Sequence, residues 1–246
     1  MIKLLKRIWV CYWILVLALI FLVCYPAYLI LLSKEKWYPK ANILRRKWAQ
    51  LLFIFTGLRW KIVYEEQLDP NRAYIFCPNH SSYTDIPMFM LLYPHYKYRI
   101  MAKAELSKIP LFNIFFRTVD ISVDRQSRVE AFKALKDAET SAQNGYKLLI
   151  FPEGTISPEA PKMGEFKNGP FKLAVENGIP IVPVTFIDDW YLLDIKRTFT
   201  GRPGLARAIV HKPIETKGLT KKDIEAVKQQ TFNTINNTLK NYYKID

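Results

Sequence analysis

The sequence predicts an α/β fold, in which a mixed, largely parallel sheet is flanked by helices and preceded by an apolar helical segment. Three observations lead to this prediction. From residue 59 onward, short apolar runs typical of buried strands alternate with longer runs of helical periodicity. Polar motifs follow directly after several of these runs, at the positions where open α/β sheets gather ligand-binding groups. The first 57 residues instead contain a long run without charge.

This uncharged run, residues 8–32, lies between charged clusters at residues 6–7 and 34–36. A bilayer core requires about 20 apolar residues, so the run is long enough to span one. It is also longer than the apolar part of a signal peptide and lacks a small-residue cleavage site. We therefore expect residues 1–57 to form a membrane-associated helical segment, which either crosses the bilayer or lies in its surface.

A second helix is expected at residues 41–56, with Arg45, Arg46 and Lys47 on its polar side and an apolar run after them. It is interpreted either as an ordinary helix of the folded domain or as a helix docked on the membrane surface. The basic residues between 34 and 47 outnumber those before the apolar run. This imbalance favours a folded domain on the cytoplasmic side.

The net charge of +14 is distributed unevenly. Residues 1–50 hold nine Lys and Arg against one acidic residue, a net +8, and residues 201–246 hold nine against four, a net +5. A nucleic-acid-binding protein more often carries such an excess in a stripe on its folded domain. Basic residues beside an apolar segment indicate anionic lipid headgroups instead. We expect an anionic membrane surface as a partner, and no nucleic acid.

Cysteine and histidine usage narrows the chemistry further. Cys11, Cys24 and Cys77 form no C-x-x-C motif and no paired framework, which favours a reduced compartment over a disulfide scaffold. The three histidines include no H-E-x-x-H spacing. No metal site is therefore predicted.

After residue 57, apolar runs bounded by turn-forming residues alternate with helical patterns. Strands are expected at 60–64, 73–77, 98–102, 119–123, 147–151, 181–186 and 206–212. Helices are expected at 84–93, 126–143, 168–177 and 220–242. Because each helix can return the chain to the same edge of the sheet, most strands are expected to be parallel.

The most informative stretch is residues 79–85, in which a histidine, His80, is followed five positions later by an aspartate, Asp85. On one continuous helix, positions five apart are rotated by about 140°, so these side chains would diverge. They converge if His80 lies in a loop and Asp85 in the first helical turn, with Thr84 as the N-cap. An imidazole held by a carboxylate can take a proton from a hydroxyl near neutral pH.

This stretch also has plainer interpretations. His80 could be a capping or buried structural histidine, and Asp85 could only complement a helix dipole. The neighbouring Ser81 and Ser82 lack the G-x-S-x-G surroundings of a nucleophile, and core packing explains Cys77 better than catalysis does. If the chain supplies no nucleophile, the reacting hydroxyl belongs to the substrate.

Four further motifs follow or enter predicted strands. They are Lys103, Arg125, the run Phe151-Pro152-Glu153-Gly154-Thr155, and Pro183 in the strand expected at 181–186. Basic groups at strand ends suit a phosphate or carboxylate ligand. Each motif has an alternative: a solvated strand end, a surface ion pair, a plain turn with a positive-φ glycine, or an edge strand marked by proline.

Taken together and in this order, these motifs resemble those of the glycerolipid acyltransferases, most closely the 1-acylglycerol-3-phosphate acyltransferases. The resemblance covers about residues 60–212, and the N-terminal segment also fits it. It implies that His80 and Asp85 form the H-x4-D catalytic dyad. It also implies contacts with the substrate from Lys103, Arg125, Glu153, Gly154, Thr155 and Pro183.

The resemblance further implies the reaction and the partners. Residues 58–246 would be the catalytic domain, on the cytoplasmic face of a membrane. It would transfer an acyl chain from acyl-CoA or acyl carrier protein to the free hydroxyl of a lysophospholipid, giving phosphatidic acid from 1-acylglycerol-3-phosphate. The thioester is a co-substrate, and no cofactor is expected. Backbone N–H groups at a strand-end turn, near Gly154, are candidates for stabilising the oxyanion.

One position departs from the family pattern. The block that usually reads Glu-Gly-Thr-Arg ends here in Ile156. Either Arg125, Lys103, Lys162 or Lys167 contacts the acceptor's phosphate, or the acceptor is another lyso-lipid, such as an N-acylated amino acid. Two other classes stay open: a non-catalytic lipid-binding protein that kept the fold, and a thioester hydrolase, which the lack of a nucleophile disfavours.

Overall fold

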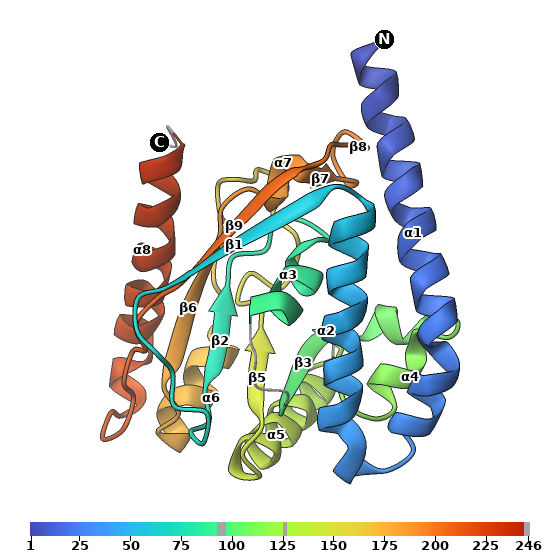
Figure 1. The fold of residues 1–246 in the computed structure, drawn as a ribbon. Helices are drawn as coiled ribbons and strands as arrows, with labels where there is room; N and C mark the ends of the chain where they lie inside the picture. The colour runs from blue at the N-terminus through green and yellow to red at the C-terminus, as the bar shows by residue number, and fades with distance from the viewer. Residues whose placement is uncertain (93–96, 125–126, 244–246) are drawn as a thin grey trace.

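A seven-stranded sheet forms the centre of the computed structural model, which describes residues 1–92, 97–124 and 127–243 (Figure 1). In spatial order the strands are β1 Leu58–Tyr64, β9 Gly204–Val210, β6 Ile181–Phe186, β2 Ile75–Pro78, β5 Lys147–Ile150, β3 Tyr98–Lys103 and β4 Ile121–Val123. Every neighbouring pair is parallel except β6 with β9. The mixed, largely parallel sheet is therefore confirmed.

Successive residues of a strand point to opposite sides of the sheet, so this sheet has a buried core on each face. Helices cover both cores. On β2, Phe76 belongs to one core and Ile75 to the other. The first core is covered by α1 Ile2–Leu31, α2 Tyr38–Phe55, α3 Asp85–Leu92 and α4 Asn113–Phe116. The second is covered by α5 Arg128–Gln143, α6 Gly169–Asn177 and α8 Ile224–Tyr242. Figure 1 shows α1 and α2 side by side at one end of the molecule and α8 at the other.

Each expected strand lies within two residues of an observed one. The expected helices also form, although residues 93 and 126 lie outside the described part of the chain. The sequence did not predict several short elements. These are α4, α7 Asp189–Leu192, the strand pair β7 Leu193–Asp194 and β8 Thr200–Gly201, and the 3-10 turns η1 Glu35–Trp37, η2 Ala104–Lys108 and η3 Lys221–Asp223. Elements this short contain too few residues to show a period.

Pro183 lies in an interior strand, so the edge-strand interpretation of this proline is wrong. β6 is fully buried between β2 and β9. The antiparallel ladder with β9 ends at the pair Val184–Val210. One residue beyond it, the carbonyl of Pro183 accepts a hydrogen bond from the N–H of His211 at 3.0 Å. A proline is tolerated there because it stands at the end of the ladder.

The apolar helix α1 lies along the folded body. Trp9 donates its indole N–H to the carbonyl of Thr56 at 3.1 Å, and the hydroxyl of Tyr12 donates to that of Phe55 at 2.9 Å. Trp9 also packs on Gly201, where a Cβ would lie only 2.5 Å from its ring. Glycine therefore lets β8 approach the helix. Among the described residues, α1 alone is long and apolar enough to cross a membrane, with a mean hydropathy of 2.7.

Arg45 on α2 is buried, so the prediction that it lies on the polar side of the helix is wrong. Its guanidinium donates to both oxygens of Asp120, at 3.0 and 2.6 Å, and to the side-chain oxygen of Asn42 at 3.1 Å. Asp120 also accepts the N–H of Ile100 at 3.1 Å. This buried group joins α2 to β3 and to the start of β4. It has a structural role rather than a role in binding headgroups.

Candidate active site

The site lies where parallel strands end. β2, β5, β3, β4 and β6 point the same way, so their carboxyl ends meet at one edge of the sheet. The loops that follow β2 and β5 bring residues 79–85 and 151–157 together there, and the N–H of Ser157 donates to the carbonyl of His80 at 2.8 Å. This is the edge at which open α/β sheets gather ligands.

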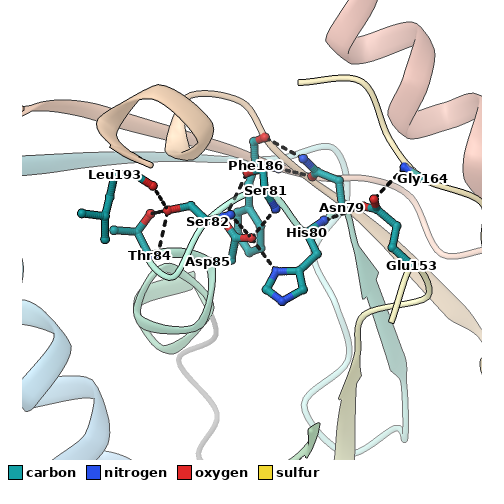
Figure 2. A network of polar contacts seen from close by, with 10 residues as sticks. All are labelled: Asn79, His80, Ser81, Ser82, Thr84, Asp85, Glu153, Gly164, Phe186 and Leu193. Atoms are coloured by element: carbon teal, nitrogen blue, oxygen red, sulfur yellow. Dashed lines mark hydrogen bonds and ion pairs between the residues drawn. The ribbon is translucent and has the colours of Figure 1, made fainter. Parts of the chain in front are cut away.

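At this edge His80 and Asp85 form a hydrogen-bonded pair (Figure 2). His80 lies in the loop and Asp85 begins α3, as the five-residue spacing predicted. Nδ1 of His80 lies 2.8 Å from Oδ2 of Asp85. The carboxylate therefore holds the proton on Nδ1 and leaves Nε2 as the free base. The side chain of His80 is 16% exposed and that of Asp85 is 0% exposed, so the imidazole is the part of the pair that a ligand can reach.

Backbone groups hold the Asp85 carboxylate in place. Besides His80, its Oδ2 accepts the N–H of Ser81 at 2.7 Å and that of Ser82 at 2.9 Å. These three hydrogen bonds to one oxygen fix the orientation of the carboxylate. The hydroxyl of Ser82 accepts the N–H of Thr84 and donates to the carbonyl of Leu193. The tight loop is tied to β7 in this way.

The imidazole is also supported from the β5 loop. The ring of Phe151 stacks on that of His80, with centroids 4.0 Å apart and planes 27° apart. Two residues further on, one oxygen of Glu153 accepts the N–H of His80 at 2.7 Å, and the other accepts the N–H of Gly164 at 2.7 Å. Burial raises the pKa of Glu153 to about 7, because desolvation outweighs these two hydrogen bonds.

Asn79 fastens the catalytic loop to the neighbouring strand. Its side-chain amide donates to the carbonyl of Phe186 at 3.0 Å and accepts the N–H of the same residue at 2.8 Å. Figure 2 shows this amide pointing away from the imidazole, toward β6. The side chain therefore replaces a strand residue and continues the pairing of β2 with β6 for one more step.

The other predicted residues lie in different settings. Lys103 ends β3 and pairs with Glu105 at 2.8 Å on the surface, while Arg125 lies outside the described residues. Gly154 has the expected positive φ of 76°, and its N–H donates to the carbonyl of Phe151 at 3.1 Å. That N–H is therefore already used in a turn and not free for an oxyanion. Thr155 is exposed, and Ile156 is buried.

Neither serine nor cysteine offers a nucleophile. Ser81 and Ser82 are buried, and the hydroxyl of Ser82 is used in the loop's own hydrogen bonds. Cys77 is completely buried, and desolvation raises the pKa of its thiol well above the usual range. Within the part of the chain that the structure describes, no group of three or more His, Cys, Asp or Glu side chains is placed to hold a metal ion.

Two residues near the pair were not singled out from the sequence. Phe151, beneath the imidazole, belonged to a predicted motif but had no assigned role. Asp189 opens α7 and is completely buried, with Asp85 among its neighbours. Nothing in the sequence around Asp189 points to residue 85, because only the pairing of β2 with β6 brings the two together.

Comparison with known proteins agrees with this geometry. A family model described as Acyltransferase matches residues 59–187. The 1-acyl-sn-glycerol-3-phosphate acyltransferase of Saccharomyces cerevisiae is 34% identical over 200 residues, covering 78% of this chain and 65% of the yeast protein. The human 1-acyl-sn-glycerol-3-phosphate acyltransferase beta is 29% identical, over 70% of this chain and 62% of the human one. The chain thus spans less than two thirds of these relatives' length.

A solved structure extends the likeness to nearly the whole chain. The crystal structure of the 1-acyl-sn-glycerophosphate acyltransferase PlsC from Thermotoga maritima superposes with a TM-score of 0.79. It covers 98% of each chain at 24% sequence identity. At that identity the comparison shows a shared fold.

Proposed function

The chain belongs to the acyltransferase family, and from this premise we propose that it transfers an acyl chain from a thioester to the free hydroxyl of a lysophospholipid. The observation that carries the proposal is the pair itself, with Nδ1 of His80 on the Asp85 carboxylate and an imidazole that stays partly exposed. Nε2 takes the proton of the acceptor's hydroxyl, and Asp85 stabilises the imidazolium that forms. The names of the relatives favour 1-acylglycerol-3-phosphate as acceptor and phosphatidic acid as product.

The chemistry then needs no covalent acyl-enzyme. The oxygen of the acceptor forms a bond to the thioester carbonyl, and the carbon–sulfur bond breaks as the tetrahedral intermediate collapses. The proton held by His80 returns to the leaving thiolate. Either acyl-CoA or acyl carrier protein fits this scheme, because the reacting thioester is the same in both.

In this proposal the other residues of the site either position the His80 loop or contact the substrate. Both oxygens of Glu153 are engaged with backbone N–H groups, so it positions the His80 loop. Lys103, Arg125, Thr155 and Pro183 are proposed to contact substrate, as the family resemblance implies. The surface partner of Lys103 is easily exchanged for a phosphate, since an exposed ion pair contributes little.

We propose that the chain works as two parts, with residues 1–57 on the membrane and residues 58–246 as the catalytic domain. Side chains of α1 contact the body from Trp9 to Tyr28, through Thr56 at one end and Phe115 at the other. A helix held along a folded domain for that distance cannot cross a bilayer without taking the domain with it. α1 therefore lies in the interfacial layer of the cytoplasmic leaflet, where its exposed row enters the lipid.

Replacement of His80 by Ala tests the reaction. We expect the rate of acyl transfer to fall roughly 10²- to 10⁴-fold, the usual contribution of a general base, with little change in thermal stability. The measurement is thiol release together with mass spectrometry of the lipid product. Cys77→Ala is the matched control for a covalent route and should keep its activity. Wild-type turnover in His80→Ala would refute the base assignment, and thiol release without an acceptor would indicate a thioester hydrolase.

Ile156 makes a second class of acceptor, the N-acylated amino acids, worth testing in the same assay. This side chain is buried and uncharged where the family block ends in arginine, so residue 156 supplies no cation for a phosphate. Incubating one acyl-CoA with 1-acylglycerol-3-phosphate and, separately, with an N-acylated amino acid decides between the two. Product from the second acceptor alone would replace the phosphatidic acid proposal. A protein that binds both lipids and releases no thiol would be a non-catalytic lipid-binding relative.

A further inference from the structure

A second aspartate lies behind the dyad. Asp189 follows β6, the strand beside β2, so it reaches the same edge of the sheet as Asp85. Its side chain is completely buried, and no donor among the described residues bonds to either of its carboxyl oxygens. The groups nearest to it are the carboxyl of Asp85 and the side chain of Thr84. A buried acceptor without a donor is rare in folded proteins, and it requires an explanation.

The hydrogen bonds around Asp85 show which of the two carboxyls is ionised. Oδ2 of Asp85 receives three N–H donors between 2.7 and 2.9 Å. Its Oδ1 receives only a long contact from the hydroxyl of Ser81 at 3.4 Å, which leaves an acceptor position to spare. The carboxyl of Asp189 has no comparable donors. Asp85 therefore holds the charge, and a proton between the two belongs on Asp189.

The remaining charges in this region are compensated. Asp188, the residue before Asp189, is paired through both oxygens with Arg207, at 2.7 and 2.6 Å, and accepts hydroxyls from Tyr191 and Tyr243. Burial is the largest influence on Asp189, followed by the carboxyl of Asp85 and then by the charge of Asp188. Together they raise the pKa of Asp189 well above its usual range, and the opposing effect of the Thr84 side chain is the smallest.

We propose that Asp189 is a positioning residue that stays protonated and donates its carboxyl hydrogen bond to the Asp85 carboxylate. This inference rests on the proposed role of His80 as the base. A neutral acid in this position fixes the rotation of Asp85 so that Oδ2 faces Nδ1 of His80. It also draws negative charge toward Oδ1, which makes Asp85 less basic. The proton taken at Nε2 then stays on the imidazole instead of leading to protonation of Asp85.

Two substitutions of similar size separate this role from a packing role. Asp189→Asn keeps a neutral donor, and Asp189→Leu removes the donor. We expect Asp189→Asn to keep activity within a few-fold and Asp189→Leu to lose roughly 10- to 100-fold in kcat with KM nearly unchanged. We expect the activity of the wild type to decline at alkaline pH as Asp189 ionises. This decline should be absent in Asp189→Asn, because an amide does not ionise in this range.

Two measurements need no acyl transfer, so they also decide the matter if the proposed function fails. At mildly alkaline pH, above the pKa of about 7 of Glu153, the infrared spectrum of the wild type should still contain the carbonyl band of a protonated carboxyl, and Asp189→Asn should lack it. In an NMR titration, the pKa of His80 should rise in Asp189→Leu, where Asp85 is more basic, and stay near the wild-type value in Asp189→Asn. Absence of the infrared band, equal damage from both substitutions, or an unchanged His80 titration in a folded Asp189→Leu would overturn the proposal.

Discussion

Glu153 joins the two loops of the site through one carboxyl group. Its oxygens accept one N–H from the His80 loop and one from Gly164, eleven residues further along the chain. Because burial raises its pKa to about 7, the native state binds this proton more tightly than the unfolded chain does. The stability that Glu153 contributes is therefore fully present below pH 4.5 and is lost as the pH rises through about 7.

Replacement of Glu153 by Gln should remove this pH dependence. An amide has one acceptor oxygen, so one of the two N–H groups loses its partner at every pH, and only the slope of the difference reports ionisation. Relative to Glu153→Gln, the wild type should lose on the order of 3 kcal/mol in free energy of unfolding between pH 4.5 and about 7. Urea denaturation at several pH values measures this difference.

Glu165→Gln is the control for this experiment, since Glu165 lies on the same loop with its side chain 80% exposed. It should change the free energy of unfolding by less than about 0.5 kcal/mol at every pH. A difference between wild type and Glu153→Gln that stays constant with pH, or grows as the pH rises, would contradict the raised pKa.

The contact between His80 and Asp85 could be predicted from the sequence, but its supports could not. The five-residue spacing placed His80 in a loop and Asp85 at a helix start, because local geometry alone decides whether the two side chains converge. Asp189 lies more than one hundred residues away in sequence and is brought near only by the order of strands in the sheet. Likewise, the sequence gives no sign that both oxygens of Glu153 are engaged.

Among the helices, α2 shows most clearly what the local sequence pattern does not predict. Three consecutive basic residues indicated one polar side, yet the first of them, Arg45, enters the core to meet Asp120. A buried carboxylate seventy-five residues away leaves no trace in the local pattern. The longer elements were predicted because the interior strands are short continuous apolar runs and most of the longer helices repeat their apolar residues about every 3.6 positions. α4 and α7, each of four residues, have no such repeat.

The buried ion pair predicts how α2 is anchored. Asp120→Asn removes the charge while its side-chain oxygen still accepts the N–H of Ile100. The guanidinium of Arg45 is then buried without a counter-charge, which should lower the free energy of unfolding by about 3–5 kcal/mol. The measurement is urea denaturation. In the double variant Arg45→Met with Asp120→Asn, much of this loss should be recovered, because no unpaired charge remains.

The outcome of the double variant decides between two accounts of Asp120. If Asp120→Asn and the double variant are equally unstable, the loss comes from the hydrogen bonds of Asp120 rather than from the charge of Arg45. Equal stability of all three proteins would show that the pair does not anchor α2 at all.

For the molecule as a whole, the exposed side of α1 is a large apolar surface. Leu15, Leu19 and Leu22 lie on one face of the helix and are each more than half exposed. The exposed Phe55 of α2 adjoins this face, since Tyr12 bonds to its carbonyl. An apolar surface of this kind, on a chain with a net charge of +14, fits an anionic lipid surface.

Leu19→Glu should therefore weaken binding to vesicles that contain an anionic lipid, with little effect on thermal stability. The physical reason is the cost of placing a carboxylate in the acyl region next to negative headgroups. Sedimentation with vesicles measures the bound fraction. Phe132→Glu is the matched control. Phe132 is 66% exposed, and its helix α5 covers the face of the sheet opposite to α1. Equal loss in both variants would indicate a general charge effect, and no loss in Leu19→Glu would exclude this face.

The contact between Trp9 and Gly201 has a consequence for synthesis. The strand that covers this part of α1 is translated about 190 residues after the helix, and β9, the partner of β1, follows it. At typical ribosome speeds the delay is roughly 10 to 40 s. During that time β8 is not yet available to pack on this side of the nascent helix. A bilayer would bury the same apolar side chains. A helix that binds a bilayer during this interval is anchored before the sheet is complete.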